Sequence, residues 1–485
     1  KQFSESNSES DLLLALGTKS GRKRFPGLCQ ALHSDPAKET LLNSTVELVN
    51  NVGRAAKPDL VRLLGAKLKP PAVAKLLSMN LRVVQNIFAR KRSDSTTSPF
   101  SLSYPPNVTR VKHDPGFPRE AVAYCLSEAG IGMDRVELVA YYEQPWVKFE
   151  RILETTLAYA PRGVRPFLQA MPLWLKEKLW IGRVIERELG YDGTVIYPEQ
   201  HESHAASAFF PSPFERAAIL TMDGVGEWST ATWGTGEGNR IALSSELEFP
   251  HSLGLLYSAF TYYTGFRVNS GEYKVMGLAP YGEPKFAPLI FDKLVDVKDD
   301  GSFRLDLSYF DYCTGLRMTN ARFDALFGGP ARKPEERLTQ REMDLAASIQ
   351  AITEEVVLKL ARSVARTTGE RTLCLAGGVA LNCVANGKLL RDKTFDRIWI
   401  QPAAGDAGGA VGAALVATHL YRGETRRLNG AIDGMYGGYL GPAYAQAEVE
   451  RRLRAAGADF EVLADGELIE RCASSLAEGR ALGWH

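Results

Sequence analysis

Residues 217–234 read AAILTMDGVGEWSTATWG, and they decide the fold. Ala217–Met222 is an apolar run typical of a buried strand, and Asp223 with Gly224 ends it in a turn. Trp228–Gly234 then alternates in the way that a paired strand does, so the stretch predicts two neighbouring strands. Because the first strand runs directly into a carboxylate, Asp223 is expected at the carboxyl end of an open sheet, where ligands bind.

Strands and helices alternate along the rest of the chain, which predicts an α/β fold. Further strands are expected at Val136–Tyr142, Thr194–Tyr197, Thr372–Ala376 and Arg397–Gln401. Helices are expected at Pro118–Glu128, at Lys148–Leu189 with interruptions at Pro161 and Pro172, and at Ser252–Thr264, Glu342–Thr367, Gly408–Tyr421 and Tyr444–Ala456. No repeat of fixed period is present, which excludes a solenoid.

The composition is that of an ordinary globular protein. With 485 residues, 45% apolar and 24% charged, the chain has room for about two or three domains. Lys and Arg (58) balance Asp and Glu (57), which removes the general electrostatic argument for a nucleic-acid partner. No apolar stretch reaches the roughly 20 residues that span a bilayer, so no membrane partner is expected. The six cysteines are scattered without a CxxC pair, which predicts a cytoplasmic location.

The domain organisation follows from changes in composition. Residues 1–110 carry polar and basic runs without recognisable chemistry and are predicted to be disordered or extraneous. Residues 111–430 are predicted to form one α/β domain. The loop-like run GMYGGYLGP (434–442) separates it from a helix, so residues 431–485 are predicted to begin another domain.

Three glycine-rich turns each follow an expected strand. They are TMDGVGEW (221–228), CLAGGVALN (374–382) and PAAGDAGGAVGAAL (402–415). Glycine lets the backbone approach a phosphate, and the start of a following helix offers unpaired N–H donors. The three turns favour a nucleotide or phosphorylated ligand, and tight turns needed only for packing are the alternative. None of them matches a P-loop or a dinucleotide-binding motif.

Two carboxylates and two imidazoles could serve a ligand. Asp223 and Asp406 follow strands, where a carboxylate orients Mg²⁺ or a ligand hydroxyl, or stabilises the turn itself. In QHESH (200–204), His201 and His204 are three apart and Gln200 and His204 are four apart, so both pairs share a helical face. Two imidazoles with a distant carboxylate would form a Zn or Fe site, and hydrogen bonding at a helix start is the alternative.

A further glycine-containing segment is SGEYKVMGLAPYG (270–282), which carries Glu272 and Lys274. We expect it to be a loop that covers a ligand, with a solvated charged turn as the alternative. The aromatic-rich HSLGLLYSAFTYYTGF (251–266) is expected in the core.

Four long segments carry a family resemblance: HESHAASAFFPSPFERAAILTMDGVGEWSTATWG (201–234), FPHSLGLLYSAFTYYTGFRVNSGEYKVMGLAPYGEP (249–284), LAGGVALNCVANGKLL (375–390) and QPAAGDAGGAVGAAL (401–415). They resemble the bacterial O-carbamoyltransferases of the nodulation and antibiotic-tailoring type, from about Lys112 to about Gly483. The resemblance implies a first domain of the actin, hexokinase and heat-shock ATPase superfamily, similar to the tRNA threonylcarbamoyl-transfer protein. It implies that the start of a domain similar to the YrdC threonylcarbamoyl-adenylate synthase follows.

The resemblance also implies an activity. Carbamoyl phosphate and ATP, with Mg²⁺, would give carbamoyl adenylate in the second domain, and the first domain would transfer the carbamoyl group to an acceptor hydroxyl of a natural product or glycan. The partners are then small-molecule substrates, and a homodimer is open. Adenylation supplies a good leaving group to a poor electrophile, and the acceptor oxygen needs positioning and charge stabilisation.

Residue roles follow from the same resemblance. The phosphate-handling loop corresponds to Asp223, Gly224 and Gly226, and the adenosine motif to Gly377 and Gly378. We expect Asn382, Gly405 and Gly408 to complete the cofactor-binding set, and Asp223 and Lys274 to be catalytic.

The family's metal site uses two histidines four apart on a helix and one aspartate, which correspond here to Gln200, His204 and Asp406. An amide is a weaker ligand than imidazole for Fe or Zn. We therefore expect weakened metal binding through His204 and Asp406, with His201 as a compensating ligand.

The two ends depart from the family pattern. Residues 1–110 lack the strand, the His-containing loop and the hairpin with which family members begin, and the chain stops at His485, where the adenylate-forming domain would be starting. We therefore expect an incomplete carbamoyltransferase that does not itself synthesise carbamoyl adenylate. A kinase or ATPase of the same superfamily and a non-catalytic nucleotide-binding remnant are the alternatives.

Overall fold

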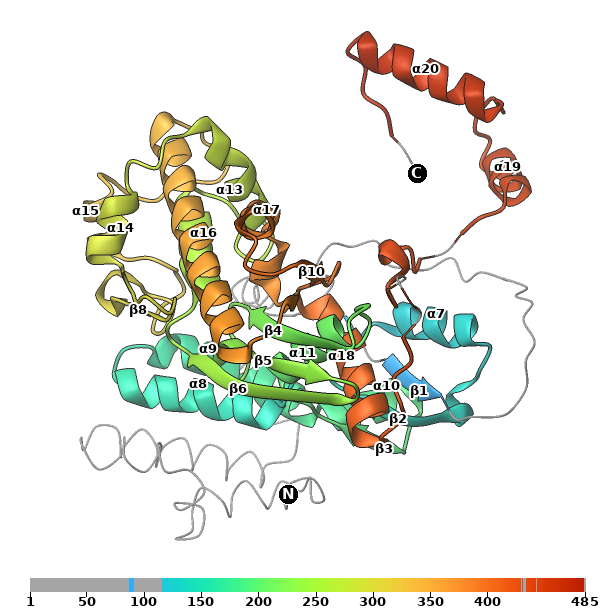
Figure 1. The fold of residues 1–485 in the computed structure, drawn as a ribbon, viewed down its shortest axis with the longest axis horizontal. Coiled ribbons are helices and arrows are strands. Elements are labelled where there is room, and N and C mark those ends of the chain that lie inside the picture. The colour runs from blue at the N-terminus through green and yellow to red at the C-terminus, as the bar shows by residue number, and fades with distance from the viewer. Residues whose placement is uncertain (1–86, 91–115, 429, 431–432, 442, 484–485) are drawn as a thin grey trace, which may run out of the picture. The chain divides into compact units, whose positions relative to one another are not determined.

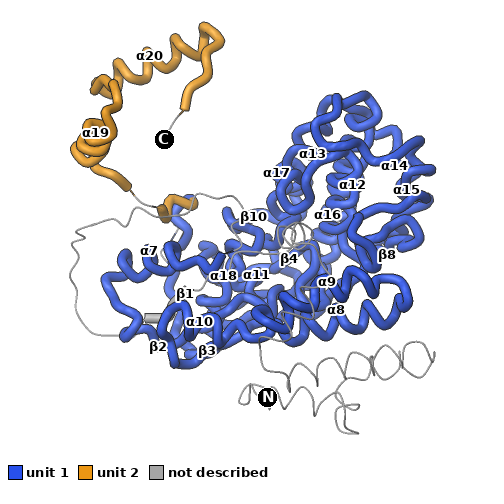
Figure 2. The backbone as a smooth tube through the Cα atoms, turned by 180° about the vertical axis from the view of Figure 1, so that it is seen from behind, with its two compact units in different colours: residues 1–437 blue, residues 438–485 orange. Residues whose placement is uncertain are grey.

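The structure is a computed structural model, and the residues it describes are 87–90 and 116–483 without 429, 431, 432 and 442 (Figure 1). The chain divides into two compact units, Lys1–Gly437 and Gly438–His485, coloured blue and orange in Figure 2. Apart from residues 87–90, the tail predicted to be disordered or extraneous lies outside the described residues, so that prediction stays a prediction.

A five-stranded sheet in the order β10-β9-β4-β5-β6 forms the centre of the first unit. Its strands are β4 (Arg216–Met222), β5 (Ser229–Glu237), β6 (Arg240–Glu248), β9 (Thr372–Ala376) and β10 (Arg397–Ile400). Strand β9 runs parallel to β4 and β10, whereas β4, β5 and β6 are antiparallel. The two neighbouring strands predicted from residues 217–234 are confirmed. Strand β6 was not predicted, because this edge strand is mostly polar and shows little apolar periodicity.

Both faces of the central sheet are covered, which explains the unbroken apolar run of β4. Ala218, Leu220 and Met222 pack in one cluster with α12 (Leu253–Tyr263) and α16 (Gln340–Thr368). Ala217 and Ile219 pack in another cluster with residues of α11 (Gln200–Phe209). Successive side chains of a strand point to opposite faces, so a strand buried on both sides shows no polar alternation.

A smaller sheet has the order β1-β2-β3. Strand β2 (Val136–Ala140) pairs in parallel with β3 (Thr194–Ile196), and both were predicted. Strand β1 (Ile87–Arg90) pairs antiparallel with β2 and was not predicted, because four residues are too few to show a period.

Helices α11 and α18 (Asp406–Leu415) pack closely, and a π-helical turn, Val416–Tyr421, continues α18. Glycine permits the contact, since a Cβ on Gly412 would overlap the carbonyl oxygen of Ser203. The packing brings the first residues of the two helices, Gln200 and Asp406, into contact.

The remaining helices of the first unit are α7 (Arg119–Ala129), α8 (Pro145–Tyr159), α9 (Val164–Lys176), α10 (Ile181–Leu189), α13 (Glu272–Leu278), α14 (Ala287–Lys293), α15 (Ala321–Leu326) and α17 (Cys383–Asp392). Strands β7 (Val295–Val297) and β8 (Phe303–Leu305) form a two-stranded sheet. The predicted interruption at Pro161 is confirmed. The interruption predicted at Pro172 is wrong, because α9 continues through it with Phe167 and Met171 buried, and this packing outweighs one lost hydrogen bond.

The second unit contains α19 (Gln446–Ala455), which was predicted, and α20 (Asp465–Ala477). None of the side chains described in this unit is buried. Within the described part of the chain, no helix is both long enough and apolar enough to cross a membrane.

Candidate functional site

One imidazole and two carboxylates meet at the carboxyl end of β4. His204 comes from α11, Asp223 follows β4, and Asp406 begins α18. His204 Nε2 lies 3.4 Å from Asp223 Oδ2 and 3.8 Å from Asp406 Oδ1. A potential ligand atom of each residue lies within 4.8 Å of the other two, so the group has the composition of a metal site. We call these three residues the His–Asp–Asp cluster.

Gln200 contacts the cluster through its side-chain amide. Its Nε2 donates a hydrogen bond to Asp223 Oδ2 at 2.8 Å and to Asp406 Oδ1 at 3.2 Å. On the other side of the amide, Lys148 Nζ donates to Gln200 Oε1 at 3.5 Å. The three positions that the family resemblance implied, Gln200, His204 and Asp406, are thus brought together, and Asp223 lies among them.

Glu227 fixes the start of α11. Its carboxylate accepts hydrogen bonds from the backbone N–H of Gln200 at 3.0 Å and of Gln144, the residue before α8, at 2.7 Å. A negative charge at a helix start is stabilising. Burial raises the pKa of the Glu227 carboxyl, and the two backbone donors and Lys148 oppose the rise.

Sequence reasoning gave no role to Glu227, Lys148 or Glu143, which forms an ion pair with Lys148. Glu227 could have been identified as a candidate site residue, because it lies four residues after Asp223 in a glycine-rich turn. Nothing in the sequence pointed to Lys148, because a lysine on an amphipathic helix usually lies on the solvated face of that helix.

The Asp223 carboxylate accepts a third hydrogen bond, from the backbone N–H of Gly378 at 3.2 Å. Ser252, at the start of α12, holds the loop that follows β4 by donating to the carbonyl oxygen of Asp223 at 3.1 Å. The position of the carboxylate is therefore set by α11, α12 and the turn after β9.

The glycines of the predicted cofactor turns are of two kinds. Gly377 has a φ of 88°, and a Cβ there would overlap the carbonyl oxygen of Met222. A Cβ on Gly408 would overlap the carbonyl oxygen of Ala403, and one on Gly226 would lie 3.0 Å from His201 Cδ2. On Gly378 it would lie 2.9 Å from Asp223 Oδ1. These four glycines are needed for packing.

Gly224 and Gly405 are of the second kind. The nearest atom to a Cβ on Gly224 is 4.0 Å away, and a Cβ on Gly405 meets nothing within 4 Å. Each is the residue next to an aspartate of the cluster, so these two glycines border the space beside the His–Asp–Asp cluster.

His201 lies outside the cluster. Its Nδ1 is 2.7 Å from Thr221 Oγ1, and burial, with the His204 imidazole, lowers its pKa to about 3, so the ring is neutral. Among the described residues, the group that could hold a metal contains Asp223 and not His201. The structure therefore does not place His201 as the compensating ligand that the sequence analysis expected.

Asn382 and Lys274 also lie away from the cluster. The Asn382 side chain caps α17 by accepting from the Ala385 N–H at 3.0 Å, and it exchanges two hydrogen bonds with Gln350. Lys274 is exposed on α13, with Nζ 5.8 Å from the centre of the Phe266 ring. The loop or turn expected at 270–282 is instead largely helical, with Val275 and Leu278 buried, and a role in covering a ligand stays a prediction.

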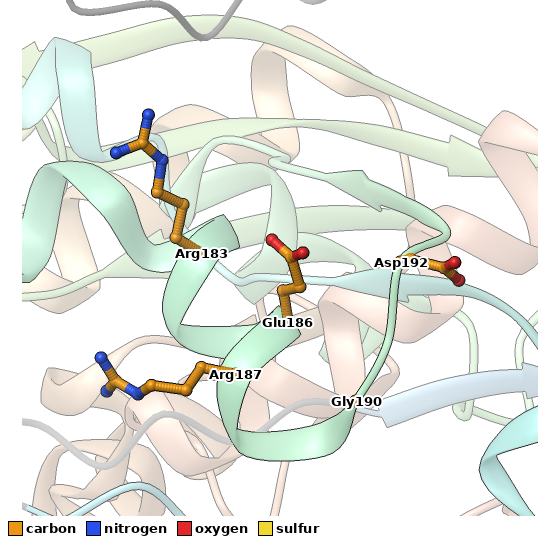
Figure 3. A pocket seen from close by; sticks show the side chains of 5 residues that line it. All are labelled: Arg183, Glu186, Arg187, Gly190 and Asp192. Atoms are coloured by element: carbon orange, nitrogen blue, oxygen red, sulfur yellow. The ribbon is translucent and has the colours of Figure 1, made fainter.

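Two hollows lie elsewhere on the described surface. One of about 490 Å³ at the end of α10 is lined by Arg183, Glu186, Arg187, Gly190 and Asp192 (Figure 3). Its charged side chains spread apart instead of converging on one point (Figure 3). The other, of about 400 Å³, is lined by Arg362, Ala365, Arg366, Gly369, Glu370, Arg371 and Thr394. Neither lining contains a predicted site residue.

Comparison with known proteins adds the family context. Residues 105–415 match the family model described as Carbamoyltransferase N-terminus. The uncharacterized protein sll1178 of Synechocystis sp. is 55% identical over 78% of this chain and 63% of that protein. The nodulation protein NolNO of Sinorhizobium fredii is 33% identical over 78% of this chain and 52% of that protein. The nodulation protein NolO of Bradyrhizobium diazoefficiens is 35% identical over 59% of this chain and 49% of that protein.

The chain thus spans less than two thirds of the length of each of these relatives. Among solved structures, the crystal structure of T. kodakarensis HypF matches 51% of this chain and 39% of that chain at 14% identity. Its TM-score is 0.28, too low to support a conclusion.

Proposed function

The chain belongs to the carbamoyltransferase family, whose N-terminal region it matches over residues 105–415, and we propose that it transfers a carbamoyl group to an acceptor hydroxyl. The observation that carries the proposal is the His–Asp–Asp cluster bordered by Gly224 and Gly405. A buried carboxylate, Asp223, and a partly buried one, Asp406, beside open backbone suit a site that must hold both a nucleotide and a hydroxyl group.

The proposed donor is carbamoyl adenylate, formed from ATP and carbamoyl phosphate with Mg²⁺. The acceptor oxygen attacks the carbamoyl carbon, the bond from that carbon to the phosphate oxygen breaks, and AMP leaves. The acceptor loses its proton in the same reaction, so a base must lie close to the hydroxyl. Asp223 and Asp406 supply carboxylates there, and the open backbone at Gly224 and Gly405 would bind the phosphate.

A transition metal at the cluster fits the residues poorly. Where the family resemblance implied a second imidazole, Gln200 turns an N–H group toward both carboxylates. An amide nitrogen with its hydrogens offers no lone pair to a metal. The roles proposed for the aspartates and the glycine-rich turns therefore include no step through such an ion.

Valine at the two open glycines tests the proposed site. Gly224→Val and Gly405→Val each place a side chain into open space, so we expect the fold to persist and the ligand to be blocked. Titration calorimetry with AMP, and with an analogue of carbamoyl adenylate in which a sulfamate replaces the phosphate, should show affinity reduced about tenfold or more, or about 1.4 kcal/mol.

The matched control is Gly466→Val in the second unit, where a Cβ also meets nothing within 4 Å. Unchanged affinity in both Gly224→Val and Gly405→Val would refute the proposed site. Transfer is then measured by mass spectrometry, as the mass of one carbamoyl group added to a hydroxylated acceptor.

Two other functions are alternatives to carbamoyl transfer, and assays with the same substrates distinguish them. Asp223 at a strand end would equally serve phosphoryl transfer by a kinase or ATPase. Acceptor-dependent ADP formation without any carbamoyl donor would favour that function. Nucleotide binding without transfer from supplied carbamoyl adenylate would instead indicate a non-catalytic protein. The cytoplasmic location and the homodimer stay predictions from the sequence.

A further inference from the structure

We propose that hydrogen bonds, and not a bound transition-metal ion, hold the His–Asp–Asp cluster together in this chain, with Gln200 as the positioning residue. The inference rests on the geometry of the cluster alone. It does not depend on whether the protein transfers a carbamoyl group.

The orientation of the Gln200 amide is the first argument. Nε2 faces two carboxylate oxygens, at 2.8 and 3.2 Å, and Oε1 faces the Lys148 ammonium at 3.5 Å. To offer Oε1 to a metal, the amide would have to turn over. Its oxygen would then lie against the two carboxylates and its NH₂ group against the ammonium. Both contacts are repulsive, so Lys148 and the aspartates together hold the amide with its N–H groups toward the cluster.

The two nitrogens of His204 give the second argument. Nε2 lies 3.4 Å from Asp223 Oδ2, and a carboxylate only accepts hydrogen bonds, so Nε2 carries a hydrogen. Nδ1 is buried and has no hydrogen-bond partner within the described parts of the chain. A histidine that binds a metal through one nitrogen almost always donates the hydrogen of the other to an acceptor. Among the described residues His204 has no such acceptor, so nothing there supports the tautomer that a metal requires.

The third argument is that both carboxylate oxygens of Asp223 already accept hydrogen bonds. Its two oxygens take hydrogen bonds from Gln200 Nε2, His204 Nε2 and the Gly378 N–H. A positive charge is also present close by, because Lys148 lies next to Gln200 with only 16% of its side chain exposed. The contacts that a cation would make to the carboxylate are therefore made by hydrogens of the chain itself.

The first test uses the full chain without substitution. After purification, its metal content is measured by mass spectrometry of the elements, and its thermal unfolding is followed with EDTA, with Zn²⁺ and with Mn²⁺. We expect far less than one equivalent of metal and the same unfolding midpoint in all three conditions. One tightly bound equivalent, or a midpoint lowered by EDTA, would overturn the proposal.

The second test converts the amide. Gln200→His supplies an imidazole four residues before His204, and we expect Zn²⁺ affinity to rise about tenfold or more, the range in which even supporting contacts change metal affinity. Gln446→His is the matched control, because Gln446 is also the first residue of a helix, α19, and is exposed. If Gln200→His binds Zn²⁺ no more tightly than the control, the proposal is overturned.

Gln200→Glu tests whether Gln200 positions the aspartates through its N–H groups or only fills space. The substitution keeps the length of the side chain, removes both N–H donors and adds a negative charge beside two aspartates. We expect a lower unfolding midpoint in EDTA that Mn²⁺ restores in part. A midpoint equally low with and without Mn²⁺ would count against the proposal. If either variant fails to fold, the metal content of the unsubstituted chain and its unfolding midpoint in EDTA still test the proposal. None of these measurements depends on carbamoyl transfer.

Discussion

Arg426 shows how a single buried side chain supports the helix that carries His204. Its guanidinium donates to the carbonyl oxygens of Phe209 at 2.8 Å, Phe210 at 2.9 Å, Ser212 at 2.6 Å and Phe214 at 2.8 Å. Phe209 is the last residue of α11 and Phe210 caps it, at an end where carbonyl groups lack partners inside the helix and a cation is favourable. The two ends of α11 are thus held by opposite charges, Glu227 at its start and Arg426 at its end.

Replacing this guanidinium should be costly. Arg426→Met leaves several buried carbonyl groups without their donor, so we expect the free energy of unfolding to fall by about 2–4 kcal/mol, measured by urea denaturation. The neighbouring Arg427 is exposed, and Arg427→Met should change stability by less than about 0.5 kcal/mol. Equal losses in the two variants would contradict the role assigned to Arg426.

At the scale of elements, the site depends on the close packing of α11 and α18. Each helix begins with a residue that contacts the cluster or belongs to it, Gln200 on α11 and Asp406 on α18. A small shift between the two axes would move the Gln200 amide away from Asp406. The residue that sets their separation is Gly412, which lies against Ser203.

A methyl group at this contact should therefore separate the helices. We expect Gly412→Ala to lower the free energy of unfolding by about 1–3 kcal/mol, because the added atom has no room. Gly277→Ala is the control, since Gly277 lies inside α13 and a Cβ there meets nothing within 4 Å. Alanine is the better helix former, so this control should gain up to about 1 kcal/mol. Denaturation curves of the two variants shifted in the same direction would refute the argument.

At the scale of the whole molecule, every residue assigned to the site belongs to the first unit, and the second unit has no buried side chain among its described residues. Several of its apolar side chains are more than half exposed, namely Val462 (56%), Ile469 (58%) and Leu476 (57%). Apolar side chains that gather into an exposed patch bind other surfaces or promote association.

Removal of residues 438–485 should leave the first unit intact. We expect the shortened chain to unfold cooperatively at the same midpoint, because none of the side chains described in the second unit is buried. Binding of a hydrophobic dye should decrease with the loss of the exposed apolar side chains. Calorimetry and dye fluorescence measure the two effects, and a clearly lower midpoint would show that residues 438–485 stabilise the first unit.

The sequence alone determined the elements and the ligand candidates within each. The apolar run of β4, the glycine-rich turns after β4 and β9, and the helical spacing of Gln200 and His204 are local features, because each depends on residues only a few positions apart. Family resemblance added the metal-ligand role of Asp406 and the carbamoyltransferase family, and the family model confirms the family. Asp223 was likewise recognised from its place at the end of an apolar strand.

Only the tertiary structure decided how these residues act on one another. Gln200 and Asp406 are 206 positions apart in the chain, yet the Gln200 amide donates to both Asp406 and Asp223. Sequence spacing carries no information about such contacts, because the packing of α11 between the sheet and α18 creates them. The tertiary structure also distinguishes glycines that lie against backbone, such as Gly377 beside Met222, from those that face open space, such as Gly405. The orientation of the Gln200 amide depends on three charged side chains that are distant in sequence. They are Lys148 on α8, Asp223 after β4 and Asp406 on α18.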